Sequence, residues 1–515
     1  MRDEVPGSLT TPDEVKTSAG TFVFADGMPT AETVAAAYDR LDHAHGIEAF
    51  TAGLPAVSQW AVRKGYEAAG IGDNDVLIFS ELMDCRSLFL TANADTVYFW
   101  TFLDLSNGPL VVTVPERVLC AVDDMWWRWV TDLGIPGPDR GAGGDYLFAG
   151  PGWDGPLPEG GVFVCRSRTT RVSILGRAFL QNDDPAPAAA RIKDQLKITP
   201  YTAGGHGFSI AAFLGGHSPM AQPVPPRTPR FVEGTGLALN TIPPNDYSFY
   251  ELLDQAVQNE PASALDPEVA APIRAIGIVK GQPFDPDSRM RAILTDAVAT
   301  ANALTRATAM APRESEGFQF YPGTGSQWTS PLFAGGYSFQ TPPPQVTKDG
   351  IQAYPDTGAK LLNARAAFLY LATGITPAMC MNLPRIGSQY IGATVDANRA
   401  PLEGGRTYSV TLPPGIPAEA FWSLTVYDNQ TRSMLVTGQR YPRAGSQAYP
   451  SPAAQASPDG STTIWLSPRQ PGSVPDGNWI QTIPGRNWFT ILRFYSPLPA
   501  FFDRSWQPTE IQPAD

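Results

Sequence analysis

The fold is decided by the stretch Asn93-Ala94-Asp95-Thr96-Val97-Tyr98-Phe99-Trp100, which is typical of a β-strand. Successive side chains of a strand point to opposite faces, so Asn93 and Asp95 are expected on one face. Tyr98 and Trp100 then lie on the other face. An amide, a carboxylate, a phenol and an indole are all chemically capable groups. The stretch therefore predicts either a polar network in the core or a functional site.

The composition predicts a large, β-rich globular protein. The chain has 515 residues, which is more than one hydrophobic core holds, so two or more domains are expected. Hydrophobic residues make up 43% and charged residues 17%, which excludes global disorder. The 48 glycines and 51 prolines are scattered, which is typical of many turns between short strands.

The predicted class is mainly β with helical segments (α+β), with two β-barrel or jelly-roll-like domains. We expect a helical N-terminal region at 1–75, a first β domain at 76–245, a mainly helical middle region at 246–375 and a second β domain at 376–515. Helical periodicity predicts helices from the N-cap Thr30 to Leu54, and over Ala56–Ala69, Ser248–Gln258, Met290–Ala309 and Gly358–Thr373. Strands are expected over Gly20–Phe24, Leu110–Pro115, Val118–Val122, Gly161–Cys165, Arg171–Leu175, Thr407–Leu412, Phe421–Tyr427, Ser433–Val436, Thr462–Leu466 and Trp488–Tyr495.

The charge and hydropathy of the chain limit which binding partners and which cellular compartment are expected. The net charge is −13 and no basic cluster is present, so neither nucleic acid nor an anionic membrane surface is expected as a partner. No run approaches the roughly 20 apolar residues of a membrane span. The stretch Met1–Gly7 lacks the apolar core of a signal peptide. A soluble, cytoplasmic protein is expected, or a periplasmic or secreted one if an export signal has been removed; a homo-oligomer is left open.

Cysteine and histidine spacing gives no metal or redox motif. The four cysteines form no Cys-x-x-Cys pair and are expected as small buried hydrophobes: Cys85, Cys120, Cys165 and Cys380. His206 and His217 lie in glycine-rich surroundings and have no obvious companion ligands. The chain contains neither G-x-S-x-G nor H-E-x-x-H, so no serine-hydrolase or zincin signature is present.

Carboxylates and aromatic rings are the stronger candidates for chemistry. Asp123 and Asp124 follow a buried-looking strand, where they could ligate a hard divalent cation, share a proton or merely cap a turn. Trp126 and Trp127 come next, and they line a cleft for ring compounds or pack in the core. In the C-terminal half, a strand ends in Tyr427-Asp428, where Asp428 could pair with Arg432 or Arg493.

Several longer motifs resemble one known family. They are Asn93-x-Asp95-Thr96-x-Tyr98, Gly144-Asp145-Tyr146, Leu175-Gly176-Arg177, Phe421-Trp422-Ser423-Leu424-Thr425-x-Tyr427-Asp428 and Asn478-Trp479. The chain resembles, from about Val15 to its end, a bacterial family that pairs two domains of unknown function, catalogued as twelve-fifty-four and twelve-fourteen. The resemblance implies two β units with helical segments between them and brings no settled activity. The segments Tyr201–Gly216 and Met379-Cys380-Met381 depart from the family pattern.

Two functional hypotheses follow. The first is a hydrolase or lyase for a small ring-bearing or sugar-like molecule. Asp95, Asp123 or Asp124 does the acid–base work, Tyr98 donates a proton or a hydrogen bond, and Asn93 has an orienting role. A divalent cation is an optional cofactor. In this hypothesis the small-molecule ligand is contacted by the following residues: Trp100, Trp126, Trp127, Tyr427, Asp428, Arg432, Asn478 and Trp479. The alternative is a non-catalytic protein that binds carbohydrate or cell-envelope material; in a purely structural variant, the polar motifs only satisfy each other.

Overall fold

The chain folds as a mixed α+β protein built mostly from sheets. The computed structural model describes residues 5–158, 160–202, 214, 224–343, 345–347, 350–352 and 358–514. It divides into two compact units: unit 1 comprises Met1–Val57 and Pro244–Leu304, and unit 2 comprises Ser58–Pro243 and Thr305–Asp515. None of the helices in the described ranges is long and apolar enough to cross a lipid bilayer. The predicted division into four parts stays a prediction.

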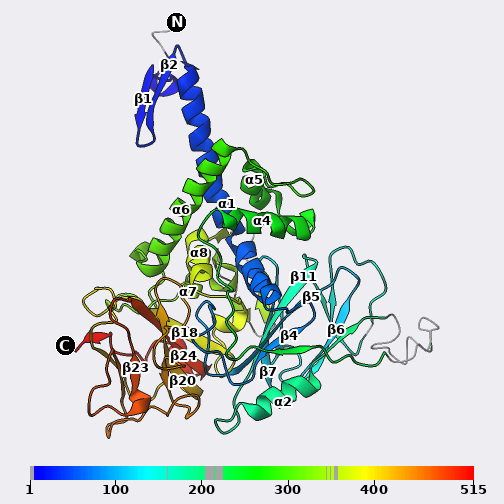
Figure 1. Cartoon of the computed structure of the whole chain (residues 1–515), viewed down its shortest axis with the longest axis vertical. Helices are drawn as coiled ribbons and strands as arrows, with labels where there is room; N and C mark the ends of the chain where they lie inside the picture. The colour runs from blue at the N-terminus through cyan, green and yellow to red at the C-terminus, as the bar shows by residue number, and fades with distance from the viewer. Residues whose placement is uncertain are drawn as a thin grey trace. The chain divides into compact units, whose positions relative to one another are not determined.

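Unit 1 combines a small antiparallel sheet with helices (Figure 1). Its elements are β1 (Glu14–Thr17), β2 (Gly20–Ala25), β3 (Met28–Pro29), α1 (Ala31–Ala68), α4 (Ser248–Asn259), α5 (Pro267–Ala275) and α6 (Ser288–Met310), of which α1 and α6 continue into unit 2. Phe50 stacks on Phe249 with a centroid distance of 4.3 Å. A Cβ at Gly46 would lie 2.6 Å from the Cβ of Ala297, so this glycine permits close helix packing.

The helix break predicted near residue 55 is wrong, because α1 is a single helix of 38 residues with Pro55 inside it. Proline removes only one backbone hydrogen bond from a helix. The neighbouring Leu54, Ala56 and Val57 are buried, and this packing offsets the loss.

The N-terminal part of unit 2 contains two sheets that pack on one core. The six-stranded sheet has the order β13-β4-β5-β11-β7-β8, and the four-stranded sheet has the order β10-β9-β6-β12. The elements are β4 (Val76–Phe79), β5 (Val97–Asp104), β6 (Leu110–Val114), β7 (Val118–Asp124), β8 (Trp129–Gly134), β9 (Gly144–Ala149), β10 (Phe163–Arg166), β11 (Arg171–Ala178), α2 (Ala186–Gln195), β12 (Lys197–Pro200) and β13 (Phe231–Glu233). Both sheets and α2 contribute to this core, for example through Phe99, Val112 and Ile192.

The C-terminal part of unit 2 repeats this plan with two four-stranded sheets, β18-β24-β20-β21 and β23-β22-β19-β25. Its strands are β18 (Ser388–Ala393), β19 (Tyr408–Leu412), β20 (Ala418–Asp428), β21 (Arg443–Gly445), β22 (Thr462–Ser467), β23 (Trp479–Gln481), β24 (Trp488–Pro497) and β25 (Gln512–Pro513). The connecting segment contains α7 (Leu332–Gly335), β14 (Gln340–Thr341), β15 (Gln345–Thr347), β16 (Gly350–Gln352), β17 (Ala359–Lys360) and α8 (Leu362–Leu371), and α9 (Pro499–Phe502) follows β24. Leu424, Leu466 and Leu492 belong to the core between these sheets.

Two sequence-based strand predictions need correction, and the barrel geometry is not seen. The strand assigned to Asn93–Trp100 begins only at Val97, because Asn93 Oδ1 accepts a hydrogen bond from the Asp95 amide (2.8 Å) and closes a turn. Ser433–Val436 is not a strand; Met434 makes only an isolated bridge to Tyr427. Within the described residues no sheet closes into a barrel, and the jelly-roll-like topology stays a prediction.

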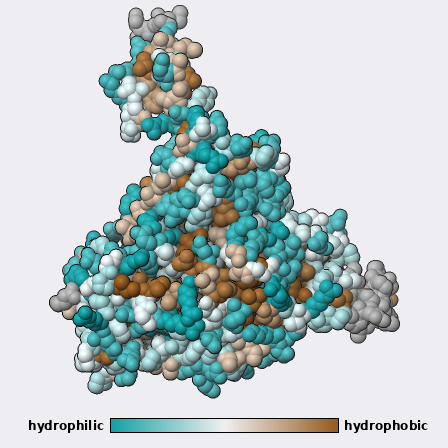
Figure 2. Space-filling view, in the orientation of Figure 1, coloured by the Kyte–Doolittle hydropathy of each residue, from teal (hydrophilic) through white to brown (hydrophobic). Residues whose placement is uncertain are grey.

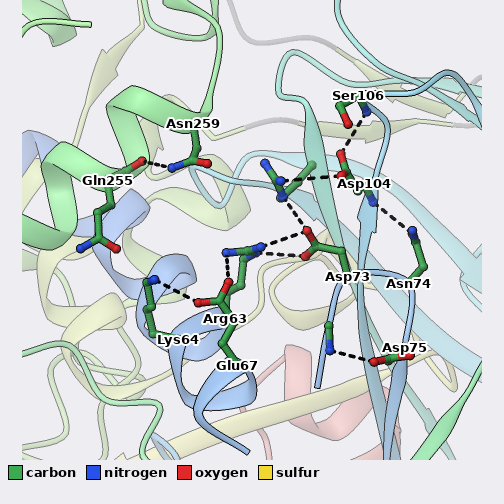
Figure 3. Close-up of polar contacts among 12 residues, drawn as sticks. Arg63, Lys64, Glu67, Asp73, Asn74, Asp75, Asp104, Ser106, Gln255 and Asn259 are labelled. Atoms are coloured by element: carbon green, nitrogen blue, oxygen red, sulfur yellow. Dashed lines mark hydrogen bonds and ion pairs between the residues drawn. The ribbon is translucent and has the colours of Figure 1, made fainter. Parts of the chain in front are cut away.

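A cluster of ion pairs joins the end of α1 to the six-stranded sheet of unit 2 (Figure 3). Arg63 donates two hydrogen bonds of 3.0 and 2.9 Å to the Asp73 carboxylate, and Arg171 of β11 donates a third of 2.9 Å. Burial alone raises the pKa of Asp73, but the two guanidinium groups outweigh it and lower that pKa below its ordinary value. The cluster therefore fixes the end of α1 to the start of β11 as long as Asp73 is ionised.

The molecular surface is mostly hydrophilic in the view of Figure 2, with hydrophobic side chains gathered in patches. The large hydrophobic side chains exposed in the strands, helices and turns of unit 2 include Phe163, Val164, Leu362 and Val436. Scattered exposed apolar residues are ordinary.

Candidate functional site

The outer face of the six-stranded sheet carries an arginine and a tyrosine side by side. Arg177 of β11 is the cross-strand partner of Tyr98 of β5, and its Nη1 donates a 3.2 Å hydrogen bond to the Tyr98 hydroxyl. Val97, Phe99 and Ala178 point to the opposite face and belong to the core. Strand alternation thus places a cation and a phenol together on the face away from the core.

The C-terminal sheet presents the same pair. Arg493 of β24 is the cross-strand partner of Tyr390 of β18, and its guanidinium lies 5.8 Å from the Tyr390 ring centroid. Arg177 links the two sheets, because it donates hydrogen bonds of 3.0 Å to the Tyr390 hydroxyl and 3.0 Å to Ser388 Oγ. Two arginine–tyrosine pairs, from strands more than 200 residues apart, therefore meet at one point.

A cavity of about 160 Å³ opens where these two sheet faces meet. Its wall is mainly apolar and aromatic, and includes Phe89, Trp100, Leu175, Phe368, Phe489 and Ile491. Its larger polar groups are Asn93, Tyr98, Arg177, Tyr390 and Arg493. Among the described residues that line it there is no carboxylate, lysine or histidine. A concave apolar site with a few convergent polar groups is the usual form of a small-molecule site.

Asp95 lies behind the cavity wall rather than in it. It is fully buried, and its Oδ1 lies 2.9 Å from Nε of Arg443, whose side chain is also fully buried. Its Oδ2 accepts hydrogen bonds from Ser423 (2.6 Å) and Tyr495 (2.8 Å). Asn93 lines the cavity and donates from Nδ2 to the same Tyr495 hydroxyl. Asp95 therefore organises the wall through Tyr495 and Asn93 without facing the cavity.

Burial keeps the phenols protonated. It raises the pKa of Tyr98 and, aided by the charge of Asp95, raises the pKa of Tyr495 well above the ordinary value. Arg177 lowers the pKa of Tyr98 in part, without cancelling the effect of burial. Tyr98 is thus a neutral phenol at neutral pH and can donate a hydrogen bond.

Asp124 lies away from the cavity and caps the turn between β7 and β8. Its Oδ1 accepts from the amides of Trp126 (2.8 Å) and Arg128 (3.1 Å), and its Oδ2 lies 2.6 Å from Arg128 Nε. Trp126 and Trp127 are buried, and Trp127 meets the Trp100 ring edge-on at 6.2 Å, so only Trp100 of the three indoles reaches the cavity. The geometry gives the other two a packing role.

The neighbouring Asp123 is engaged elsewhere. Adjacent strand residues point to opposite faces, so Asp123 and Asp124 cannot share a proton or a ligand. Asp123 Oδ2 accepts from the Ile375 amide at 3.0 Å. Next to it, Thr376 Oγ1 donates to Asp132 at 2.6 Å, and Thr376 lines the cavity. These two carboxylates hold the 375–376 segment in place.

The C-terminal candidates separate into near and distant residues. Tyr427 stacks on the cavity residue Phe489 at 5.2 Å and donates to the Ala92 carbonyl at 2.7 Å. Asp428 caps the following turn by accepting from the Gln430 amide at 2.7 Å, and its ion pair is to Arg486 (3.6 Å) rather than to Arg432 or Arg493.

Arg432, Asn478 and Trp479 are held by backbone carbonyls. Arg432 donates to the Tyr370 carbonyl at 3.2 Å and lies over the Tyr370 ring at 4.2 Å. Asn478 accepts from the Gln455 amide (2.7 Å) and donates to the Gln455 carbonyl (2.9 Å). Trp479 Nε1 lies 3.2 Å from the Ser467 carbonyl. None of the three lines the cavity, so their contacts support the surrounding loops.

The metal and cysteine candidates add no second site. In the described ranges no group of three or more His, Cys, Asp or Glu side chains could hold a metal ion. His206 and His217 lie outside the described residues. The cysteines are free thiols, of which Cys85 and Cys120 are buried.

The two halves of this site lie in two regions of the chain that match known protein families. The family described as "Protein of unknown function (DUF1254)" matches residues 74–200, and the one described as "Protein of unknown function (DUF1214)" matches residues 387–499. The chain pairs a DUF1254 region with a DUF1214 region. The resemblance inferred from the sequence motifs is confirmed, including the order of the two domains. No curated protein matches the chain.

Two solved structures are similar to the chain. The chain is similar to the VPA0106 protein from Vibrio parahaemolyticus, at 19% identity and a TM-score of 0.50, over 92% of this chain and 100% of that one. It also matches an uncharacterized protein from Burkholderia cenocepacia, at 14% identity and a TM-score of 0.38, over 94% and 99% of the two chains. The first likeness extends to the fold alone.

The DUF1254 region supplies Tyr98 and Arg177, and the DUF1214 region supplies Tyr390 and Arg493. Sequence reasoning did not assign Arg177, Tyr390, Arg493 or Arg443 to the site. The signal that could have found two of them is an arginine inside an otherwise apolar strand, as in Ile491-Leu492-Arg493-Phe494 and Leu175-Gly176-Arg177-Ala178. Burial of a charged side chain is costly, so an arginine in a buried strand indicates that the arginine has a role there.

Proposed function

We propose that the cavity between the DUF1254 and DUF1214 regions binds a small ring-bearing molecule and that the protein acts on it as a hydrolase or lyase. The observation that carries this proposal is the meeting of two arginine–tyrosine pairs, one from each region, at one apolar cavity. Packing alone favours apolar residues at such positions.

In this proposal Tyr98 is the general acid. When water attacks the carbonyl carbon of an ester and the bond to the departing oxygen breaks, the Tyr98 hydroxyl donates its proton to that oxygen. Arg177, whose Nη1 is 3.2 Å away, stabilises the phenolate, which then recovers a proton from the attacking water. Asp95 is a positioning residue, because it holds Tyr495 and Ser423 while Tyr495 accepts from Asn93. The aromatic wall orients the ring of the ligand.

Binding without chemistry is the second candidate. It is favoured by the absence of any carboxylate or histidine among the described residues that line the cavity, since a general base usually comes from these side chains. Both candidates share the ring-binding cavity and differ in the role of Tyr98.

A cavity-blocking variant tests the shared part. Ala121 lines the cavity, so Ala121→Leu should abolish binding of neutral one-ring probes such as p-cresol and benzamide in ligand-observed NMR. The exposed Ala456 provides the control substitution, Ala456→Leu. Equal binding of the probes to both variants and to the natural protein would overturn the proposal.

Turnover of a one-ring ester such as phenyl acetate separates the two candidates. Tyr98→Phe should lower kcat by about 100-fold or more if the phenol is the general acid. Tyr66→Phe is the matched control, because Tyr66 is a buried tyrosine outside the cavity whose hydroxyl has no hydrogen-bond partner in the described structure. No turnover by the natural protein, with ring binding intact, would favour binding without chemistry. An undiminished rate in Tyr98→Phe would exclude Tyr98 as the general acid.

A further inference from the structure

We infer that the ligand of this cavity is a monocarboxylate, whose anionic oxygens are bound between the guanidinium groups of Arg177 and Arg493. The inference rests on the proposed ring-binding cavity and names the chemical class that it accepts. It is carried by the charge balance of the site, by free hydrogen-bond donors and by the size and polarity of the cavity wall.

The charge balance is positive. Arg177 and Arg493 are 6% and 3% exposed, and Arg443 is 2% exposed. Asp95 is the carboxylate nearest to them in the hydrogen-bonded wall, and it is already paired with Arg443 at 2.9 Å. Arg177 and Arg493 are contacted by phenols, a serine hydroxyl and backbone carbonyls, which are all neutral. Three buried guanidinium groups therefore share the charge of Asp95, and among the described residues neither Arg177 nor Arg493 forms an ion pair with a carboxylate.

Both guanidinium groups keep unused donors. Nε of Arg177 and Nη1 of Arg493 are buried and have no hydrogen-bond partner among the described residues. A guanidinium cannot release its proton to escape this situation. Burying an unpaired cation with unsatisfied N–H groups is unfavourable, whereas an anion that accepts from both removes the penalty. A carboxylate has two oxygens that suit such charged donors.

Size and polarity favour a carboxylate on a small apolar body. The cavity of about 160 Å³ is close to an engineered cavity of about 150 Å³ that binds benzene. Apart from the polar groups around the arginines, the wall consists largely of apolar side chains such as Trp100, Leu175 and Phe489. A compact dianion such as phosphate would leave this wall unfilled. Benzoate matches both features.

Calorimetric titration of the full chain with benzoate, benzamide and inorganic phosphate tests the inference. Benzoate should bind about tenfold or more tightly than its neutral counterpart benzamide. Arg493→Gln should weaken benzoate binding by about tenfold or more and leave benzamide within about twofold. Arg385→Gln is the control, because Arg385 is exposed and pairs with Glu419. Arg493→Lys, which keeps the charge, provides a second variant if Arg493→Gln fails to fold, and it should give an intermediate loss.

The outcomes separate the two proposals. Equal affinity for benzoate and benzamide, or unchanged benzoate affinity in the Arg493 variants, would overturn the carboxylate assignment and leave the ring-binding cavity standing. Phosphate that binds more tightly than benzoate would also overturn it. If neither ring compound binds the natural protein, the proposed cavity function fails and the assignment fails with it.

Discussion

Asp95 and Arg443 form an ion pair with no access to water, and this environment decides what each residue contributes. Two ions that leave water lose hydration, and their mutual attraction repays that loss only while both partners are present. Ser423 and Tyr495 complete the contacts of the carboxylate. Asp95, the carboxylate of the stretch Asn93–Trp100, is therefore a structural element of the cavity wall.

The main expected effect of replacing Asp95 is therefore a lower free energy of unfolding. Asp95→Asn is expected to lower the free energy of unfolding by about 3–5 kcal/mol, because it leaves Arg443 buried without an anion. Urea denaturation measures this change. Asp154→Asn, at an exposed position of the same unit, should change stability by less than about 0.5 kcal/mol. An equally small effect at Asp95 would contradict the buried-pair description.

Asp132 should make stability fall as pH rises. Burial raises the pKa of Asp132 from the ordinary 3.8 to about 7. Between pH 4 and pH 7 the unfolded chain has lost this proton while the folded chain keeps it, so the free energy of unfolding decreases with pH in that window. Asp132→Asn keeps the acceptor for Thr376 and removes the titration. Its stability relative to the natural protein should rise by about 1 kcal/mol or more from pH 4 to pH 8.

Denaturation of both proteins across that pH range checks this expectation. The comparison is made as a difference because burial, the largest cause, raises the pKa of Asp123 in both proteins, while the charge of Asp132 adds a smaller rise in the natural protein alone. A difference that does not vary with pH would show that Asp132 titrates normally.

At the residue scale the sequence predicted the polar groups better than their roles. Asn93, Tyr98 and Trp100 line the cavity, and they stood out because polar and aromatic groups were concentrated in one apolar region. Asp124 could not be told from a catalytic acid by sequence, since the same carboxylate caps a turn when the chain reverses after it. Arg493 was noticed only as an ion-pair partner because no sequence pattern shows what surrounds a buried cation.

At the scale of elements, the end of α1 depends on a short-range electrostatic clamp. Asp73→Asn is expected to destabilise the protein by about 2 kcal/mol at pH 7, because it removes the charged acceptor shared by Arg63 and Arg171. The pKa of Asp73 is lowered in the folded state, so this contribution is present above about pH 4 and is lost as pH falls further. The stability difference between the two proteins should therefore shrink as pH falls below about 4, as thermal denaturation would show.

Elements with regular periodicity were predicted well from sequence. The strand expected at Leu110–Pro115 is β6, and the helix expected at Ser248–Gln258 is α4. Failures came where local chemistry overrode the pattern. The Asn93 side chain closes a turn just before β5, and packing carries α1 through Pro55.

At the scale of the molecule, Arg177 couples the two sheet systems of unit 2. Arg177→Gln removes donors to Tyr390 and Ser388 of β18, so amide exchange should become faster in β18 although the substitution lies in β11. Hydrogen exchange with mass spectrometry measures this. The control Arg171→Gln lies on the same strand but faces Asp73, and it should leave exchange in β18 unchanged. Faster exchange confined to β11 and β5 would contradict the coupling.

The meeting of the two sheet systems could not be predicted from sequence. Each of the pairs Tyr98–Arg177 and Tyr390–Arg493 follows from strand pairing inside one region. The contact between Arg177 and Tyr390 joins residues 213 positions apart, and nothing in either strand specifies the other. Long-range packing of two finished sheets determines it.

The contact between Arg177 and Tyr390 also has a consequence for inheritance. A gene that encoded the first sheet system without the second would give a product that lacks the Tyr390 and Arg493 side of the cavity. Under the proposed function, loss of either half would remove the whole binding site rather than half of it. Selection for that function would then act on both coding segments together, which is a physical reason for keeping them on one polypeptide.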